Sequence, residues 1–315
     1  MSNMTVAQGR VIDPVLSTVA QGFKHADRVG MTLFPSIDVT ERGGTTIEFG
    51  RESFRLYTVR RAPGASTAKV PFGYAGKPFS LVQDALNSSI PRELLGDASR
   101  VPGIDLGKRA TRSVMFSLTL SLEDEQAKLA TDANNYSNDR KLTLAGSDIW
   151  EDPASDPLKH IDDAKEAVRN SAGIEPNRMV IPNKAFKALR RNQKIAEKFK
   201  YTSADSITAE MLAAYFDLEM VSVAKAKYLD GTGENEKFRD VWGNSAVLAY
   251  VPPAPEGFEE PSFGYTYTLK GHPFVEQAFW DNDVKSWVYG VTYERAPLLT
   301  GISSGFLFQN VCSVG

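Results

Sequence analysis

The longest helical pattern in this sequence runs from Leu106 to about Asn135 without a proline. Residues at every fourth position form one row along a helix face, and nearly all of them are apolar or small: Ala110, Val114, Leu118, Leu122, Gln126 and Ala130. At 1.5 Å per residue such a helix is about 45 Å long. Ser121, three residues before Asp124, is the one position where a cap could begin a new helix instead. We expect one long helix that serves as a strut.

The region from residue 45 to residue 80 predicts a long β-hairpin. Thr45–Phe49 and Ser53–Arg60 alternate β-branched or aromatic residues with polar ones. A turn signal, Ala62–Ala65, lies before the returning segment. Between residues 51 and 77, one acidic residue, Glu52, is outnumbered by six basic residues: Arg51, Arg55, Arg60, Arg61, Lys69 and Lys77. Residues 51–77 therefore have a net charge of +5, which leaves −8 on the rest of a chain whose total is −3.

Two functions are open to this basic hairpin. Its aromatic residues, interleaved with the cations, could stack on the bases of single-stranded nucleic acid: Phe54, Tyr57, Phe72, Tyr74 and Phe79. The alternative is a hairpin that docks on protein. An isolated two-stranded hairpin is only marginally stable in water, so exposed aromatics favour a surface beneath it. We favour docking on the acidic surface of another copy of the chain.

Composition excludes several classes of protein. The single cysteine, Cys312, excludes a disulfide framework and a multi-cysteine metal site. The three histidines are widely separated, so no histidine-built metal site is expected, and nothing in the sequence indicates a cofactor. The net charge of −3 gives no overall reason for nucleic-acid affinity. No secretory leader or membrane span is predicted, so we expect a protein made in the cytosol.

Residues 1–36 lack sustained periodicity and predict an extended arm with a short helix near Val15–Gly22. Beyond Pro157 the pattern alternates between helices and strands, as in an α/β module. The predicted helices are 157–172, 183–191 and 207–216, and the predicted strands are 178–181 and 219–223. A later series of strands is predicted at 247–251, 265–269, 275–280 and 284–293.

One enzyme motif matches, and we reject it. Gly301–Gly305 fits the G-x-S-x-G nucleophile elbow with Ser303 as the nucleophile, a pattern that needs a following helix and a later acid and histidine. The ten residues after Gly305 contain none of these and are typical of a strand. Asp281-Asn-Asp283 lacks the later ligands of a calcium loop and predicts a hairpin turn. Cys312 has no positive neighbour and is expected to be packed rather than reactive.

The order of arm, basic hairpin, long helix, α/β module and late strands resembles the major capsid proteins of tailed bacteriophages, with their Hong-Kong-ninety-seven-type shell fold. Three short sequence segments carry the resemblance. Trp150–Pro157 looks like a W-x-D-x-x-S-D-P stretch that leads into the A-domain of that family. Gly173–Asn177 resembles a following G-x-x-P-N turn, and Ile207–Phe216 with Val221–Tyr228 resembles the helix and strand that lead to Val241-Trp-Gly243.

The resemblance implies an α+β fold made of an N-arm, a basic β-hairpin called the E-loop, a P-domain with a spine helix and an α/β A-domain. The expected divisions are an arm at 1–36, a hairpin region at 37–90, a P-domain at 91–156, an A-domain at 157–260 and late strands at 261–315 that return to both domains. The spine helix is expected to flex when a precursor shell expands.

The function that the resemblance implies is structural. Hexamers and pentamers of the chain would form an icosahedral shell around packaged double-stranded DNA, which the protein would contact non-specifically. A separate scaffolding protein, a portal and a decoration or cement protein are the implied partners, because no long scaffolding segment precedes the arm. Lys69 and Lys77 lie where some relatives place a crosslinking lysine, but its partner residues are not identifiable here. We therefore expect no crosslink, no membrane contact and no enzymatic activity.

Two alternatives remain from the sequence. An encapsulin-like compartment would share the fold and enclose an enzyme instead of DNA. A single-stranded nucleic-acid-binding protein would use the basic hairpin itself. In the capsid interpretation, the contact between subunits is expected at Arg51, Arg55, Arg60, Arg61, Lys69, Lys77, Phe54, Tyr57, Phe72 and Tyr74.

Overall fold

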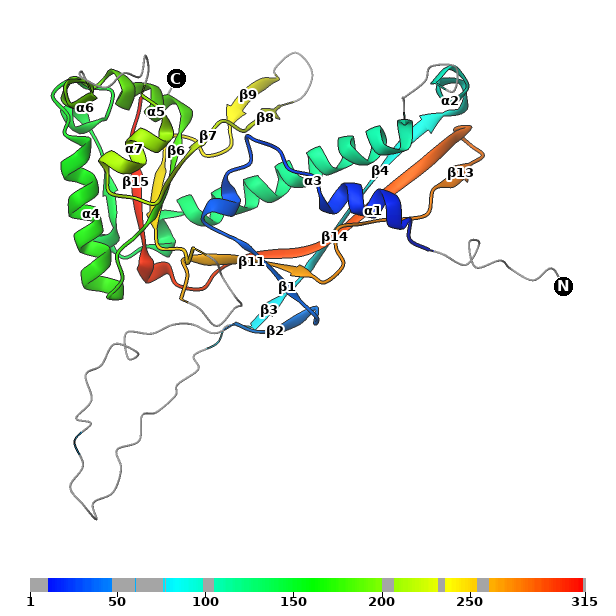
Figure 1. Cartoon of the computed structure of the whole chain (residues 1–315), viewed down its shortest axis with the longest axis horizontal. Coiled ribbons are helices and arrows are strands. Elements are labelled where there is room, and N and C mark those ends of the chain that lie inside the picture. Colours follow the sequence, from blue (N-terminus) through cyan, green and yellow to red (C-terminus); the bar gives the residue numbers. More distant parts are fainter. Residues whose placement is uncertain are drawn as a thin grey trace.

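The computed structural model describes residues 11–46, 60, 76, 78–98, 105–199, 207–231, 236–253 and 261–313. Two large sheets organise these residues (Figure 1). A helix-rich unit around one sheet lies at one end of the molecule, and a long sheet with helix α3 extends from it to the other end.

Helix α3 (Leu106–Thr131) is the predicted strut. The Asp105 carboxylate accepts the N–H of Lys108 at 3.0 Å and so caps the first turn. The helix runs unbroken through Ser121, whose hydroxyl donates to Glu125 Oε1 at 3.3 Å instead of capping a new helix. All six residues of the predicted row are buried. The prediction of one long helix is confirmed.

The larger sheet is built around β14 (Ser286–Leu299). One edge of β14 pairs antiparallel with β4 (Val82–Pro91), from Ser286 opposite Pro91 to Arg295 opposite Val82. The other edge of β14 pairs antiparallel, along its length, with β13 (Phe279–Asp281), β12 (Phe274–Val275) and β11 (Gly264–Leu269). Strand β1 (Ser36–Val39) pairs parallel with β11. Helix α3 packs across β14 and β4.

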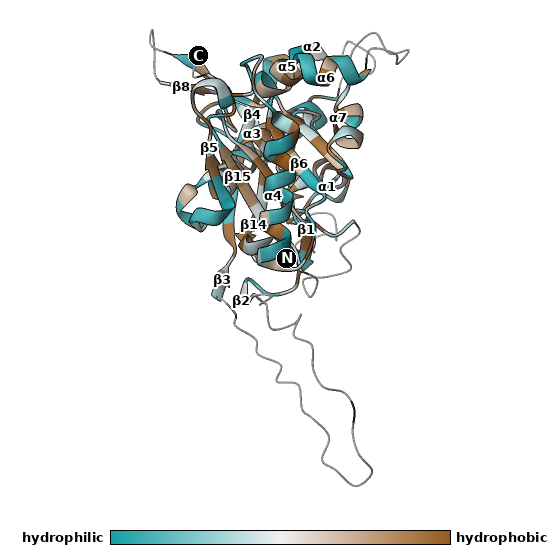
Figure 2. Ribbon diagram, turned by 90° about the vertical axis from the view of Figure 1, so that its left-hand side faces the viewer, coloured by the Kyte–Doolittle hydropathy of each residue, from teal (hydrophilic) through white to brown (hydrophobic). Residues whose placement is uncertain are grey.

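The second sheet has five strands, in the spatial order β5 (Lys141–Thr143), β15 (Gly305–Gln309), β10 (Ala246–Ala249), β6 (Arg178–Pro182) and β7 (Met220–Ala224). The helices of this unit are α4 (Pro157–Ala172), α5 (Asn183–Arg191), α6 (Gln193–Phe199) and α7 (Ala209–Tyr215). In Figure 2 the strands β6 and β15 are mainly hydrophobic, while α4 in front of them shows hydrophilic residues. Trp150, Ile161 and Met179 are among the fully buried side chains of this core.

Local sequence explains the bounds of α4. The Asp156 carboxylate accepts the N–H of Lys159, and Pro157 occupies the first turn, where its missing N–H costs nothing. Gly173 ends the helix in the left-handed conformation, with φ of 71°. The helix bounds match the prediction for 157–172.

Smaller elements complete the described part of the chain. They are α1 (Pro14–Gln21), α2 (Arg92–Ala98), the hairpins β2 (Gly43–Thr45) with β3 (Pro78–Ser80) and β8 (Lys227–Asp230) with β9 (Lys237–Asp240), and short 3₁₀ turns at Gly30–Thr32, Ala133–Asn135, Asn138–Arg140, Gly146–Asp148 and Ile302–Ser304. Among the residues described here, no helix is long and apolar enough to cross a lipid bilayer.

Two predicted elements need correction. The single strand predicted at 275–280 is wrong, because β12 and β13 are separate strands that pair with different parts of β14. The strand predicted from Val284 begins at Ser286 and continues to Leu299, beyond the predicted end at Tyr293. The helices predicted at 183–191 and 207–216 are confirmed as α5 and α7, the second in shorter form.

Candidate assembly surfaces

Most of the predicted contact residues lie outside the described part of the chain. Arg60 is described and is exposed. The others lie in segments of which nothing is described: Arg51, Arg55, Arg61, Lys69, Lys77, Phe54, Tyr57, Phe72 and Tyr74. The role of this set stays a prediction. The residues that join the hairpin to the body are described.

An ion pair holds the root of the hairpin to β14. Arg42, just before β2, donates two hydrogen bonds to the Glu294 carboxylate, from Nε at 2.7 Å and from Nη2 at 3.0 Å. The Glu294 side chain is only 5% exposed, and the hydrogen bond from Arg42 lowers the pKa of its carboxyl. The Arg42 carbonyl also accepts the N–H of Leu81 at 2.8 Å. The two strands of the root are thus fixed to the larger sheet and to each other.

An aromatic stack adds a second attachment. The ring of Phe79, on β3, lies 4.9 Å from the ring of Tyr267 with 16° between their planes. Tyr267 belongs to β11 and is buried, and this burial raises the pKa of its hydroxyl to about 12. Phe79 was predicted to be one of the hairpin aromatics, and the structure places it against the body of its own chain.

The N-terminal arm is anchored on α3 by a buried carboxylate. Glu123 accepts hydrogen bonds from the backbone N–H groups of Gly30, at 2.8 Å, and Val29, at 3.1 Å. Its third donor is the indole N–H of Trp242, at 2.6 Å. Burial raises the pKa of the Glu123 carboxyl, and these hydrogen bonds oppose the shift. A Cβ on Gly30 would lie 2.0 Å from Gln126 Oε1, so any other residue at this position would have to displace the Gln126 side chain.

A buried arginine attaches α3 to both of its strands. The Arg295 side chain, on β14, is 0% exposed and pairs with Asp84 on β4 at 2.7 Å and with Glu125 on α3 at 3.1 Å. It also donates to the carbonyl of Leu118 at 3.4 Å and lies over the Tyr293 ring. Breaking a buried pair leaves charges without partners, which makes this contact costly to lose.

The tip of the β13–β14 hairpin carries exposed aromatic side chains, with Trp280 and Trp287 on one face and Phe279 on the other. Phe279 is 48% exposed and Trp287 is 39% exposed, and the Trp287 ring lies 5.8 Å from that of Trp280. Asp281 and Asp283 lie at the turn, and neither carboxylate has an ion-pair partner in the described regions. Large exposed aromatics next to charged groups are typical of protein interfaces. The expected hairpin turn at Asp281–Asp283 is confirmed.

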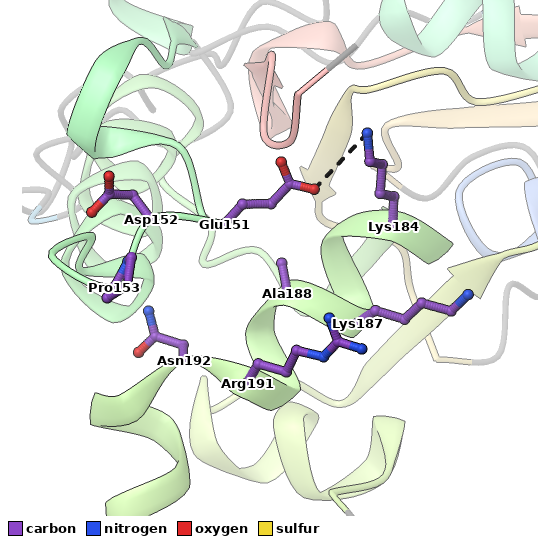
Figure 3. Close-up of a pocket in the computed structure, with 8 residues that line it drawn as sticks. All are labelled: Glu151, Asp152, Pro153, Lys184, Lys187, Ala188, Arg191 and Asn192. Atoms are coloured by element: carbon purple, nitrogen blue, oxygen red, sulfur yellow. Dashed lines mark ion pairs between the residues drawn. The ribbon is translucent and has the colours of Figure 1, made fainter. Parts of the chain in front are cut away.

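A hollow of about 420 Å³ lies beside α5 in the helix-rich unit (Figure 3). One wall is α5, which carries four basic residues and no acidic one, and the opposite wall is the Glu151–Pro153 loop. Lys184 lies 3.9 Å from the Glu151 carboxylate. Hydrogen bonds from Ser313 lower the pKa of Glu151, so this carboxylate is already occupied within its own chain. The α5 side of the unit is therefore positively charged.

The described residues do not form a nucleophile elbow. Ser303 lies in the turn between β14 and β15, so a strand follows it where the hydrolase motif requires a helix. Cys312 is 1% exposed, and burial raises the pKa of its thiol to about 11. In the described ranges no group of three or more His, Cys, Asp or Glu residues could hold a metal ion. The packed role predicted for Cys312 is confirmed.

Comparisons with known proteins connect this architecture to a family. A sequence model described as phage major capsid protein E matches residues 121–293. The major capsid protein of Burkholderia phage BcepMu is 32% identical over 306 residues, which cover 96% of this chain and 97% of that protein. This chain belongs to the phage major capsid protein E family. A crystal structure of a phage-related protein from Bordetella bronchiseptica RB50 is 44% identical, with a TM-score of 0.83 and coverage of 96% of this chain and 99% of that one.

The fold of this capsid protein is shared more widely than its sequence. The putative capsid protein of a prophage of E. coli CFT073 has a TM-score of 0.55 at 12% identity, with coverage of 95% of this chain and 99% of that one. The SrpI encapsulin of Synechococcus elongatus PCC 7942 has a TM-score of 0.52 at 10% identity, with coverage of 96% and 97%. These likenesses show the fold alone. The family match separates the phage capsid interpretation from the encapsulin alternative.

The capsid protein is therefore a structural component of a phage shell, and its place is the capsid of the virion. The predicted α+β shell fold and the predicted family are confirmed. The expected domain boundaries stay a prediction.

Sequence reasoning missed the contacts that hold the capsid protein together at α3. A signal for one of them was present, because Gln126 is a polar residue in an otherwise apolar row, and it donates to Thr266 Oγ1 at 2.8 Å. Glu123 and Arg295 gave no such signal. A charged residue that is buried beside distant partners has the same local pattern as one on the surface.

Proposed function

We propose that this capsid protein forms hexamers and pentamers of an icosahedral shell around packaged double-stranded DNA. In each ring the basic hairpin, residues 51–77, of one copy lies across the next copy. The observation that carries this proposal is the root of the hairpin. Arg42 and Phe79 fix that root to Glu294 and Tyr267 of the body. The charged segment therefore begins at a fixed position on the body.

The β13–β14 tip of the next copy is the surface that best suits the hairpin. It offers an exposed ring on each face, Trp287 on one and Phe279 on the other, for the aromatics of the hairpin. Two carboxylates at its turn, Asp281 and Asp283, suit the cations. Complementary charge supplies orientation and speed of association, and buried aromatics supply most of the strength. An exposed ion pair contributes less than about 1 kcal/mol, so the shell depends on repetition of the contact.

The remaining partners follow from the role of the protein in a shell. A scaffolding protein, a portal and a decoration or cement protein complete the proposed assembly, and contact with the packaged DNA is non-specific. The proposal includes no catalysed reaction and no crosslink through Lys69 or Lys77.

Charge reversal and its compensation test the hairpin contact. Arg60→Glu with Arg61→Glu should abolish shells seen by electron microscopy and light scattering, while circular dichroism shows a folded monomer. Arg190→Glu with Arg191→Glu on α5 changes the net charge equally and should leave shells intact. Adding Asp281→Lys and Asp283→Lys to the hairpin variant should restore shells. If the hairpin variant closes shells as well as the unmodified protein does, docking by charge is wrong.

Expression of the protein, alone or with a scaffolding protein, is a second test of the proposed function. Shells, tubes or rings support the proposed function, and so do shells that form only when a scaffolding protein is co-expressed. A chain that stays monomeric with the scaffold and binds single-stranded DNA in a strongly salt-dependent way would instead favour the nucleic-acid alternative.

A further inference from the structure

Strand β4 forms a long free edge of the larger sheet. It pairs with β14 on one side and, within the described residues, with no strand on the other. Seven of its ten residues are exposed, among them Val82 at 61% and Leu86 at 43%. A row of unpaired N–H and C=O groups in such an edge is a ready template for another strand.

The register shows which backbone groups of β4 are free. The N–H of Arg92 donates to the carbonyl of Lys285, so even-numbered residues of β4 exchange hydrogen bonds with β14. Odd-numbered residues therefore direct their groups away from β14. Leu81 agrees with this, because its N–H donates to Arg42 on the outer side. The outward groups with no backbone partner in the described regions belong to Gln83, Ala85, Asn87 and Ser89.

Within the described residues, the usual protections of an edge strand are absent from β4. Proteins shield such edges with lysine, proline, bulges or a covering element. Strand β4 has no basic residue, its proline is at the last position, Pro91, and its register with β14 is unbroken. Its one charged residue, Asp84, forms an ion pair with Arg295 at 2.7 Å. An edge with these properties fits a neutral strand better than a charged one.

The β4 sequence is complementary to itself in one antiparallel register. With Leu86 opposite Leu86, Gln83 pairs with Ser89 and Ala85 pairs with Asn87, so all outward N–H and C=O groups of these residues are used on both strands. The positions between them place Asp84 opposite Ser88. The pairing ends at Gln83 and Ser89, because Arg42 already lies on the outer side of Leu81, where Pro91 of the second copy would come. Between these ends Leu86 meets Leu86, and no like charges face each other.

Other registers that keep the odd-numbered residues in hydrogen-bonded pairs leave groups unpaired. A shift by one step in one direction places Ser89 opposite Leu81, whose N–H is already bound to Arg42. A shift in the other direction places Gln83 opposite Pro91, which has no N–H.

We propose that the free edge of β4 pairs with β4 of a second copy across a two-fold axis at Leu86. The two larger sheets then form one continuous sheet. Such a contact is closed and uses the same surface on both copies. It goes beyond the proposed hairpin contact, which joins two different surfaces. Helix α3 packs over a face of the sheet, on both β14 and β4.

A single cysteine tests the axis. In this register the two Leu86 Cα atoms form a non-hydrogen-bonded pair about 4.5 Å apart, within the range that a disulfide spans. Leu86→Cys treated with copper phenanthroline should give covalent dimers on a non-reducing gel. Ser89→Cys is the matched control on the same exposed edge, because its two copies would lie about 20 Å apart along the strands. The native Cys312 is buried and should not contribute.

The outcomes separate this inference from the proposed function. Dimers from Leu86→Cys alone support the β4 pair. No dimer from Leu86→Cys, although a maleimide labels it, or equal crosslinking of Ser89→Cys, overturns the pair. Shells without the Leu86→Cys crosslink would leave the proposed function intact and remove only this inference. A crosslink in a protein that builds no shells with its scaffold would support the β4 pair and count against the proposed function.

A proline gives a second measurement. Ala85→Pro removes one outward N–H and none of the hydrogen bonds to β14, so the monomer should keep its fold by circular dichroism. The proline should lower the crosslinking yield of Leu86→Cys at least tenfold. An unchanged yield would count against strand pairing.

Discussion

The indole N–H of Trp242 donates to the Glu123 carboxylate on α3 over 2.6 Å. The same carboxylate accepts the backbone N–H groups of Val29 and Gly30. Three segments far apart in the sequence therefore meet at one buried side chain. The arm, the long helix and the loop before β10 are held in register by this single group.

Removal of that group should destabilise the whole subunit. Glu123→Ala leaves three N–H donors without their acceptor, and we expect a loss of about 3 kcal/mol in the free energy of unfolding. Urea denaturation followed by tryptophan fluorescence measures it. Glu93→Ala on α2 removes an exposed carboxylate, 71% exposed, and should change stability by less than about 0.5 kcal/mol. Equal effects of the two substitutions would contradict the role of Glu123 as an anchor.

Arg295 should contribute far more to the free energy of unfolding than an exposed arginine does. Arg295→Ala removes a fully buried guanidinium together with its contacts to Asp84 and Glu125, and should cost about 3 kcal/mol or more. Arg239→Ala breaks an ion pair of equal length, 2.7 Å to Asp230, but at an exposed site, and should cost less than about 1 kcal/mol. Urea midpoints of the two variants measure the difference. If Arg239→Ala is the more damaging, burial of Arg295 does not decide its contribution.

The contact at the root of the hairpin should depend on pH in a definite direction. Arg42 lowers the pKa of Glu294 in the folded protein, so below its ordinary value of 4.5 the unfolded chain takes up this proton first. The stability due to Glu294 is therefore fully present above pH 4.5 and is lost as the pH falls through the lowered value. Thermal denaturation should show a gap between the native protein and Arg42→Met that shrinks in this acidic range.

The control for that experiment lies on α3. Arg112 is exposed and forms no ion pair with any described residue, so Arg112→Met should show no gap that closes with acid. His272 is the other titratable group near the contact, with Nε2 at 4.0 Å from Glu294 Oε1, and it is unchanged in both variants. A gap of constant size down to pH 2 would argue against the ion pair as the source of stability.

The thiol of Cys312 should be inert in the folded protein. Burial raises its pKa to about 11, so little thiolate exists at pH 8. Iodoacetamide at pH 8 should leave the folded chain unmodified by mass spectrometry and should add one group per chain in 6 M guanidinium chloride. Modification of the folded protein at the rate of a free thiol would show that this side chain is reactive.

The sequence was most informative where structure depends on local spacing. The buried row of α3 follows from a four-residue repeat, and the bounds of α4 follow from Asp156, Pro157 and Gly173. Such signals need no knowledge of the partner. The short, strongly periodic elements of the helix-rich unit were predictable for the same reason.

Strand β4 was missed because its sequence lacks a strand pattern. Its residues from Gln83 to Ser89 are mostly polar and are exposed on both faces, so no alternation marks a buried side. Its position is set by β14, some two hundred residues away in the sequence. The division of 275–280 into two strands has a related cause, since each half pairs with a different part of β14. Pairing with a strand distant in the sequence therefore determines both the position of β4 and the division of 275–280.

The link between the two sheets has a mechanical consequence. Strand β14 passes through the turn at Ile302–Ser304 directly into β15 of the other sheet. A pull on the helix-rich unit is thus transmitted along the axis of β14. The hydrogen bonds between β14 and β4 lie across that axis and share such a load in shear, so they must yield together and cannot open one at a time. A shell under pressure from its contents would be reinforced along this line in every subunit.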